Sequence, residues 1–179
     1  MRELIDGLGE RGFGFVMLIF GLPAAIPNIP GLTSIFGIPV MMFAVQMMLR
    51  RPKPWLPRRV AEKTIARLDL ERVAVKGAKW MSKVEKLCKP RLTFLIGPWG
   101  ERFLGLVLFL LGLFIALPGP GTNGPPGAAI VVLAIAMIEL DGLMILIGLA
   151  ASAVAMVIAS LGAVAFLLVV WYGVQSLFY

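Results

Sequence analysis

Three long stretches of the chain carry no charged residue, and each is strongly apolar. They cover residues 12–49, 103–138 and 142–179, which are 38, 36 and 38 residues long. As one continuous helix each would be roughly 55 Å long, whereas the hydrocarbon core of a bilayer is about 30 Å thick. The pattern therefore predicts that each stretch folds back on itself as a helical hairpin.

Prolines and glycines near the middle of the first two stretches support this division. Proline removes a backbone donor and clashes with the preceding turn, so it ends or kinks a helix. The third stretch has only the weak break Ser160-Leu161-Gly162. The predicted helical limbs are 12–26, 32–49, 103–117, 127–138, 143–159 and 163–179.

Most of these limbs are shorter than the roughly 20 residues that a helix needs to cross a bilayer. Two structures fit such limbs: re-entrant hairpins whose irregular tips lie inside the membrane, and short spans in a thinned bilayer. We expect re-entrant hairpins for residues 9–49 and 100–138 and a crossing pair of helices for residues 142–179. The predicted fold class is an all-α integral membrane protein.

The composition excludes several other classes. Hydrophobic residues make up 59% of the 179 residues and charged residues 15%, and the mean hydropathy is +0.92. A soluble domain of this size could not bury so much apolar surface, and a disordered chain would be far more polar. With one cysteine, Cys88, and no histidine, neither a zinc site nor Cys-His catalysis is expected. We expect no metal and no cofactor.

Residues 50–91 differ sharply from the apolar stretches. They hold 14 of the 17 lysines and arginines and four of the ten acidic residues. The lysines recur at steps of three and four while apolar side chains take another face, which is typical of amphipathic helices at a membrane surface. We expect Lys76, Lys79, Lys83 and Lys86 to contact anionic lipid headgroups. Nucleic-acid binding, the competing interpretation, fits poorly beside lipid-soluble segments.

The basic residues also predict an orientation. Loops rich in lysine and arginine stay in the cytoplasm, which places residues 50–91 on that side. If each apolar stretch is a hairpin, both termini and residues 139–142 lie in the cytoplasm too. Trp55, Trp99 and Trp171 then fall near the ends of apolar stretches, where interfacial aromatic residues are enriched.

The first two hairpins resemble each other in sequence. Gly9-Glu10-Arg11 matches Gly100-Glu101-Arg102 at an offset of 91. Further matches are Gly21/Gly112, Ala25/Ala116 and Pro27/Pro118, then, after one residue is dropped, Gly37/Gly127, Ala44/Ala134 and Met47/Met137. Repeats with broken helices at matching places build midplane sites in many transporters. Duplication that simply makes a compact bundle is the other interpretation.

Several short motifs, in the order in which they occur, resemble the ExoD family of bacterial membrane proteins. They are residues 8–14, Leu22-Pro23, Ile38-Pro39, Gln46, residues 50–57, Pro90-Arg91-Leu92 and residues 139–142. The resemblance covers nearly the whole chain. It implies a bacterial inner-membrane protein linked to exopolysaccharide synthesis, with that machinery as a partner. The family pattern has a basic residue where this chain has Leu140, and no catalytic motif comes with the resemblance.

Nine polar residues are candidates for a gate or for contacts with a substrate. They are Glu10, Arg11, Asn28, Gln46, Glu101, Arg102, Asn123, Glu139 and Asp141. Each also has a structural interpretation. The Glu-Arg pairs and Asp141 suit helix caps or ion pairs, the asparagines suit backbone groups freed by proline, and Gln46 suits an interhelical hydrogen bond. A small-residue stripe at Gly148, Ala151, Ser152 and Ala155 suits close helix packing or dimerisation.

Two functions fit these observations. The first, which we favour, is a non-enzymatic membrane component that acts in exopolysaccharide production through partner binding or lipid organisation. The second is a small transporter or channel with a polar site between the two repeats, and a second copy of the chain is then a natural partner. A membrane enzyme fits least, because the chain has no histidine and no paired-acid motif.

Overall fold

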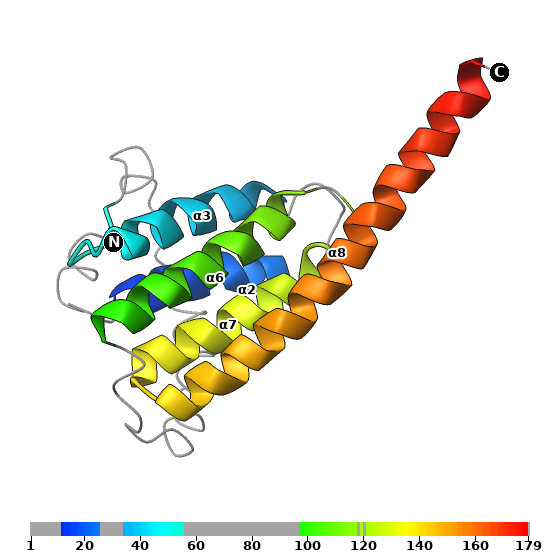
Figure 1. Ribbon diagram of the computed structural model, residues 1–179. Helices are drawn as coiled ribbons and strands as arrows, with labels where there is room; N and C mark the ends of the chain where they lie inside the picture. Colours follow the sequence, from blue (N-terminus) through cyan, green and yellow to red (C-terminus); the bar gives the residue numbers. More distant parts are fainter. Residues whose placement is uncertain (1–11, 26–33, 56–96, 118, 120, 179) are drawn as a thin grey trace, which may run out of the picture.

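The computed structural model describes residues 12–25, 34–55, 97–117, 119 and 121–178. Within these residues the chain forms five helices and no strand (Figure 1). The helices are α2 (Gly12–Ala25), α3 (Ser34–Met48), α6 (Pro98–Ala116), α7 (Gly124–Glu139) and α8 (Gly142–Phe178). The predicted all-helical class is therefore confirmed for the described residues.

The ends of the shorter helices follow the prolines and glycines of the sequence. Helix α6 begins at Pro98 and stops before Leu117, whose extended backbone precedes Pro118. The residue before a proline is pushed out of the helical region, which explains this end. Helix α7 begins with Gly124-Pro125-Pro126, and proline suits a first turn because its missing N–H has no helical partner there.

The four shorter helices form a bundle in which each helix packs mainly against a helix of the other hairpin. Helix α2 runs antiparallel to α7, because Gly14 lies against Ile138 and Gly127 lies against Ala25. Helix α3 runs antiparallel to α6 in the same way, because Gly105 lies against Met48. The chain partners α2 and α3, and likewise α6 and α7, touch less extensively. The hairpins are therefore interleaved.

Two glycines allow the closest approach between backbones. A Cβ atom at Gly37 would lie 2.5 Å from the carbonyl oxygen of Gly112 and 2.7 Å from the amide nitrogen of Ala116. A Cβ atom at Gly127 would lie 2.5 Å from the amide nitrogen of Ala25. Only glycine fits at these positions, because backbone atoms cannot move aside as a side chain can.

Large apolar side chains fill the space between the four helices. Met17 from α2, Phe43 from α3, Leu108 from α6 and Leu133 from α7 are all almost completely buried. The rings of Phe20 and Phe43 stack with their centroids 5.9 Å apart, which joins α2 to α3. This apolar core fixes the positions of the helix ends, where the polar residues lie.

Helix α8 corrects one prediction. The sequence predicts two helices in residues 142–179, but the structure has one continuous helix, Gly142–Phe178. The predicted break contains no proline, and a single glycine costs a helix only about 1 kcal/mol relative to alanine. Ser160 also keeps its hydroxyl engaged within the helix, donating a hydrogen bond to the Val157 carbonyl at 2.8 Å. The helix therefore continues through Ser160-Leu161-Gly162.

The first half of α8 packs on α7 and α6, and its second half projects beyond the bundle (Figure 1). The small-residue stripe faces inward: Gly148 lies against Leu133, and Ser152 and Ala155 are buried. This confirms the packing interpretation of the stripe within one chain. The projecting half carries exposed apolar side chains, among them Leu167, Val170 and Trp171.

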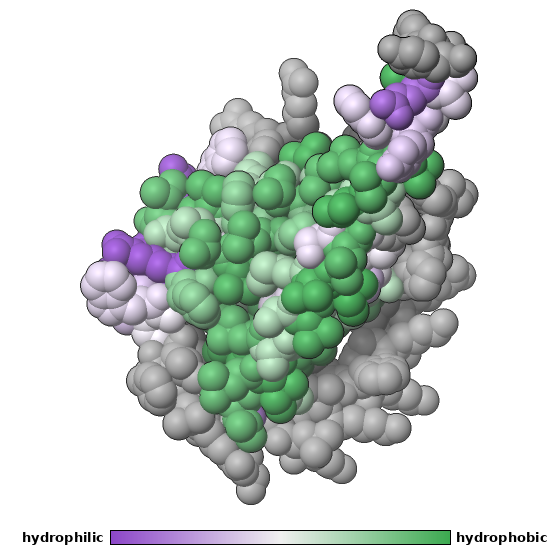
Figure 2. Space-filling model, turned by 45° about the vertical axis from the view of Figure 1, so that its right-hand side comes forward, coloured by the Kyte–Doolittle hydropathy of each residue, from purple (hydrophilic) through white to green (hydrophobic). Residues whose placement is uncertain are grey.

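Two helices, α6 and α8, are long and apolar enough to cross a membrane. In the most apolar window of α8 only 11% of the residues are buried, which distinguishes it from the core helix of a soluble protein. At 1.5 Å per residue, α8 is about 55 Å long and α2, α3 and α7 are roughly 21–24 Å long. Figure 2 shows a broad apolar surface with hydrophilic residues gathered at its ends.

Several predictions concern residues outside the described part of the chain. They are the entry pair Glu10-Arg11, the tip residue Asn28, and most of the basic segment, including Lys76, Lys79, Lys83 and Lys86. These remain predictions.

Candidate functional site

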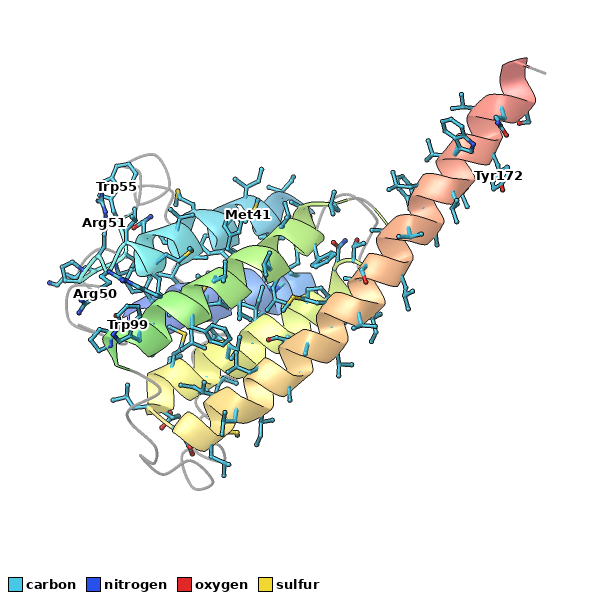
Figure 3. All side chains as sticks on the ribbon, in the orientation of Figure 1. Met41, Arg50, Arg51, Trp55, Trp99 and Tyr172 are labelled. Atoms are coloured by element: carbon cyan, nitrogen blue, oxygen red, sulfur yellow. The ribbon has the colours of Figure 1, made fainter. Side chains whose placement is uncertain are left out.

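All charged residues that the structure describes lie at one end of the bundle. They are Arg50, Arg51, Lys53, Glu101, Arg102, Glu139 and Asp141. Helices α3 and α7 end there and α6 and α8 begin there, and Figure 3 shows Arg50, Arg51, Trp55 and Trp99 at this end. We call it the charged end. The opposite end, where α6 stops and α7 starts, is the tip, and its described residues are uncharged.

Helix α3 ends at the charged end in a Schellman motif, although no glycine is present. Arg50 has a φ of 54°, in the left-handed region. Its N–H donates to the Met47 carbonyl at 2.9 Å, and the N–H of Arg51 donates to the Gln46 carbonyl at 3.1 Å. These bonds satisfy the last carbonyls of the helix. They turn the chain sharply, so the next residues run back along the end of the bundle.

Gln46 holds that returning segment in place. The side chain is only 7% exposed, and both of its polar atoms bind the backbone of Trp55. Its Oε1 accepts a hydrogen bond from the Trp55 N–H at 2.6 Å, and its Nε2 donates to the Trp55 carbonyl at 3.2 Å. The predicted interhelical bond of Gln46 is therefore replaced by a bond to the loop that follows its own helix. We call residues 50–55 the basic loop.

The clamped loop presents cations and an indole to the outside. Arg50, Arg51 and Lys53 are exposed, while Pro54 is buried beneath them. Trp55 is 54% exposed even though its backbone is fixed by Gln46. The loop is therefore anchored through its backbone, while the side chains of its cations and of Trp55 are exposed to the outside.

A second aromatic residue and a fourth cation stand beside the basic loop at the start of α6. Trp99 is 80% exposed, and the guanidinium carbon of Arg102 lies 5.4 Å from the centre of its ring. This distance suits a cation–π interaction. Because Gly105 packs against Met48, the start of α6 and the basic loop share one corner of the bundle. Glu101, half-buried in the first turn of α6, also lies at this end.

Asp141 caps helix α8. One carboxylate oxygen, Oδ1, accepts hydrogen bonds from the N–H groups of Leu143 at 2.9 Å and Met144 at 3.3 Å. This is the predicted N-cap, which satisfies two amides that have no helical partner. Asp141 as a whole residue is only 3% exposed. Glu139, in the last turn of α7, is half-buried.

Thr122, one of the polar residues that the sequence places at the tip beside Asn123, binds the backbone there. The Thr122 hydroxyl is fully buried and lies 2.9 Å from the Leu117 carbonyl and 2.8 Å from the Gly119 carbonyl. Asn123 sits at the start of α7, where its carbonyl accepts the Gly127 N–H at 2.9 Å. Partnering of backbone groups near the prolines, which the sequence predicts for tip residues, is therefore seen at Thr122.

The structure brings some predicted site residues together and separates others. Gln46, Glu101, Arg102, Glu139 and Asp141 share the charged end, whereas Asn123 lies at the tip. Buried apolar side chains such as Phe43, Leu108 and Leu133 fill the described core between the two ends. The described candidates therefore do not form one continuous polar site.

Sequence reasoning did not find the contact between Gln46 and Trp55 or the left-handed ends of α3 and α7. Arg50 and Leu140 occupy positions where glycine is usual, so the common signal for a helix end is missing. Pro52, two residues after Arg50, is a weaker signal of the same kind, because proline often follows a helix end.

Comparison with known proteins places these features in a family context. A family model described as "Exopolysaccharide synthesis, ExoD" matches residues 1–161. Protein ExoD of Rhizobium meliloti is 37% identical over 150 residues, which cover 81% of this chain and 62% of that protein. An uncharacterized protein of Synechocystis sp. is 30% identical over 136 residues, covering 75% of this chain and 64% of its own length.

The chain thus spans less than two thirds of the length of either relative. No solved structure matches it.

Proposed function

Because the chain belongs to the ExoD family, which is linked to exopolysaccharide synthesis, we propose that it is a non-enzymatic integral protein of the bacterial inner membrane that serves this process. It acts by binding partners or by organising lipid at the membrane. Membership of the family links the chain to exopolysaccharide synthesis. The arrangement of the described helices and charges supports the membrane location and the mode of action.

One observation carries the proposal: the charges lie at one end of a bundle whose sides are apolar. Large exposed hydrophobic side chains occur on α3, α6 and α8, for example Ile38, Phe103 and Val157. Monomeric soluble proteins rarely expose an apolar surface of this breadth. Such a surface above a charged rim suits a protein whose sides face lipid and whose one end faces water.

The geometry favours partial penetration by the hairpins and a full crossing by α8. Helices α2, α3 and α7, at roughly 21–24 Å, are shorter than a hydrocarbon core of about 30 Å, whereas α8 at about 55 Å exceeds it. Helix α6, at about 29 Å, is long enough to cross, but it shares its hairpin with the shorter α7, so the second hairpin as a whole does not span the core. A tilted α8 reaches across the core and both headgroup regions, about 40–45 Å in total.

This arrangement revises the predicted topology. The cytoplasmic placement of the C-terminus depended on a pair of helices in residues 142–179, and α8 is a single helix. With the basic loop in the cytoplasm, α8 leads away from that side, and residue 178 lies on the periplasmic side. The positions of both hairpin ends in the cytoplasm stay as predicted.

The two hairpins also pack as copies of one unit. Gly14 lies against Ala134 and Ile138, and Gly105, 91 residues later, lies against Ala44 and Met48. The contacted residues correspond as well, because Ala134 and Ile138 stand 90 positions after Ala44 and Met48. Each hairpin thus offers the glycine of its first helix to the second helix of the other hairpin. This reciprocity supports an internal repeat with approximate two-fold symmetry along the bundle and with both hairpins pointing the same way.

A transporter with a polar site between the repeats is the alternative. The apolar packing between the charged end and the tip favours the non-transport function for the described residues. Flux through reconstituted vesicles distinguishes the two. Glu101→Gln and Asn123→Ala should change activity only in proportion to the amount of folded protein. A flux that wild-type protein supports and that a fully folded variant loses would support the transporter instead.

Two measurements test the main proposal. After alkaline carbonate extraction the chain should stay in the membrane pellet, and recovery in the supernatant would contradict membrane integration. In a bacterium lacking its own copy, the chain should restore exopolysaccharide yield, and the variant Glu139→Gln should restore it equally. Loss of yield in that variant at normal protein level would show that the Glu139 carboxylate takes part in the function, and failure of the wild-type chain to restore the yield would contradict a role in this process.

A further inference from the structure

Among the described residues, the basic loop and the start of α6 together form a surface where exposed cations and exposed indole rings lie close to one another. Three exposed cations, Arg50, Arg51 and Lys53, follow one another within four residues, and Arg102 stands nearby on Trp99. Figure 3 shows that Arg50, Arg51, Trp55 and Trp99 gather at one corner of the bundle. The question is what such a surface binds.

From this geometry we infer that the corner is a binding site for the phosphate group of an anionic phospholipid in the cytoplasmic leaflet. Arg50 and Arg51 supply the charge, Trp55 and Trp99 lie at the level of the headgroups, and Gln46 holds the loop in register. The inference rests on the proposed function, since it requires the bundle to sit in a membrane.

Charge complementarity points to a phosphate. Arginine presents a planar fork of N–H donors that matches phosphate oxygens, and two adjacent arginines provide two such forks. Basic residues next to a membrane are attracted to anionic lipids, and exposed indoles are enriched at the boundary between acyl chains and headgroups. Both residue types meet here, next to exposed apolar side chains such as Leu49, directly after α3, and Phe103 on α6.

The role of Gln46 distinguishes a built site from a loose basic loop. A free loop would lose conformational entropy when it binds, and that loss weakens binding. The two hydrogen bonds between the Gln46 side chain and the Trp55 backbone fix the far end of the loop, and the left-handed Arg50 fixes its near end. The arginines are therefore held between two fixed points before a lipid arrives. Gln46 is a positioning residue and does not itself contact the lipid.

The test measures lipid binding to the purified full-length chain in a neutral detergent. The probes are short-chain phosphatidylglycerol, short-chain phosphatidylcholine and inorganic phosphate. Wild-type protein should bind phosphatidylglycerol in preference to phosphatidylcholine, and inorganic phosphate at the same concentration should not displace it. The double variant R50Q/R51Q should bind between about 10- and 100-fold more weakly, as expected for two basic groups at an anionic surface.

A matched variant controls for net charge. Q175E/S176E lowers the net charge by the same two units, at exposed positions on the far end of α8. It should bind within about two-fold of wild type. An equal loss in both variants would show that only overall charge matters and would overturn the site. Displacement by inorganic phosphate at equal concentration would identify free phosphate as the ligand and overturn the lipid assignment.

Gln46→Leu tests the positioning role, because leucine is similar in size but cannot hold the Trp55 backbone. Binding should fall several-fold with all four cations still present, and a melting curve confirms that the variant is folded. Unchanged binding in a folded variant would remove Gln46 from the site. Carbonate extraction separates failure of the lipid site from failure of the proposed function. If the chain stays in the membrane pellet but R50Q/R51Q binds phosphatidylglycerol as tightly as wild type, only the lipid site is contradicted.

Discussion

Arg50 and Leu140 adopt the same left-handed backbone conformation, each with a φ of 54°. They end α3 and α7, and they stand 90 positions apart, the same offset as Gly37 and Gly127. The N–H groups of the next residues, Arg51 and Asp141, both donate at 3.1 Å to a carbonyl five residues earlier. Two helix ends with the same geometry at equivalent positions support the proposed internal repeat.

Leu140→Gly should stabilise the fold relative to Leu140→Ala. Left-handed backbone costs an ordinary residue about 1–2 kcal/mol, and glycine avoids that cost. Both variants lose the leucine side chain, so their comparison isolates the backbone. We expect the glycine variant to unfold with a free energy about 1 kcal/mol higher than the alanine variant, measured by thermal unfolding in detergent. Equal stability would mean that the left-handed turn is not kept in solution.

The close contacts between hairpins should make Gly37 and Gly127 intolerant of alanine. A Cβ atom at either position would meet backbone of the opposing helix at 2.5 Å. We expect Gly37→Ala and Gly127→Ala each to lower the free energy of unfolding by about 1–3 kcal/mol or more. The matched control is Gly173→Ala in α8, where the added Cβ atom would meet no atom of another part of the chain within 4 Å. It should be neutral or stabilising by up to about 1 kcal/mol.

Much of this fold could be predicted from where charges and prolines fall. The charge-free stretches and their central breakers predict the helical class, and the predicted limb 12–26 corresponds to α2, Gly12–Ala25. The interleaving could not be predicted, because every limb is apolar on all sides and shows no preferred face. The prediction of two helices in the third stretch is wrong, because Gly162 alone does not break a helix that is otherwise apolar and free of proline.

The candidate site was predictable only in part. The cap at Asp141 follows from its place immediately before an apolar helix. The hydrogen bonds between Gln46 and the Trp55 backbone join residues nine positions apart across a turn that has no glycine, so no local sequence pattern predicts them. Glutamine inside an apolar limb predicts a hydrogen bond, but it does not identify the partner.

Asp141→Ala should weaken the start of α8, because the N–H groups of Leu143 and Met144 lose their acceptor. We expect a loss of about 0.5–2 kcal/mol in the free energy of unfolding. Asp141→Asn retains a side-chain oxygen and should lose less. If both variants lose the same amount, the charge of Asp141 matters more than the cap. Chemical unfolding in detergent, followed by circular dichroism, measures both.

The revised topology predicts opposite accessibility for the two ends of α8. In a chain with Cys88 replaced by serine, a membrane-impermeant maleimide applied to intact cells should label Ser176→Cys and leave Lys53→Cys unlabelled. Lys53→Cys should react only after the membrane is opened, since the basic loop belongs in the cytoplasm. Labelling of neither position in intact cells would restore the hairpin topology with both ends inside.

A distance measurement decides directly whether residues 142–178 form one helix or two. Leu146 and Val170 are both 45% exposed, so spin labels at these positions should not disturb the packing. In one continuous helix the two positions are 24 residues apart, or about 36 Å at 1.5 Å per residue. In a hairpin that turns at residues 160–162, neighbouring helices 8–10 Å apart would bring them to roughly 10–20 Å. Double electron–electron resonance spectroscopy in reconstituted membranes should therefore give a single distance near the longer value. A dominant short distance would show that the lipid environment folds α8 in two, and the periplasmic placement of its far end would then be wrong as well.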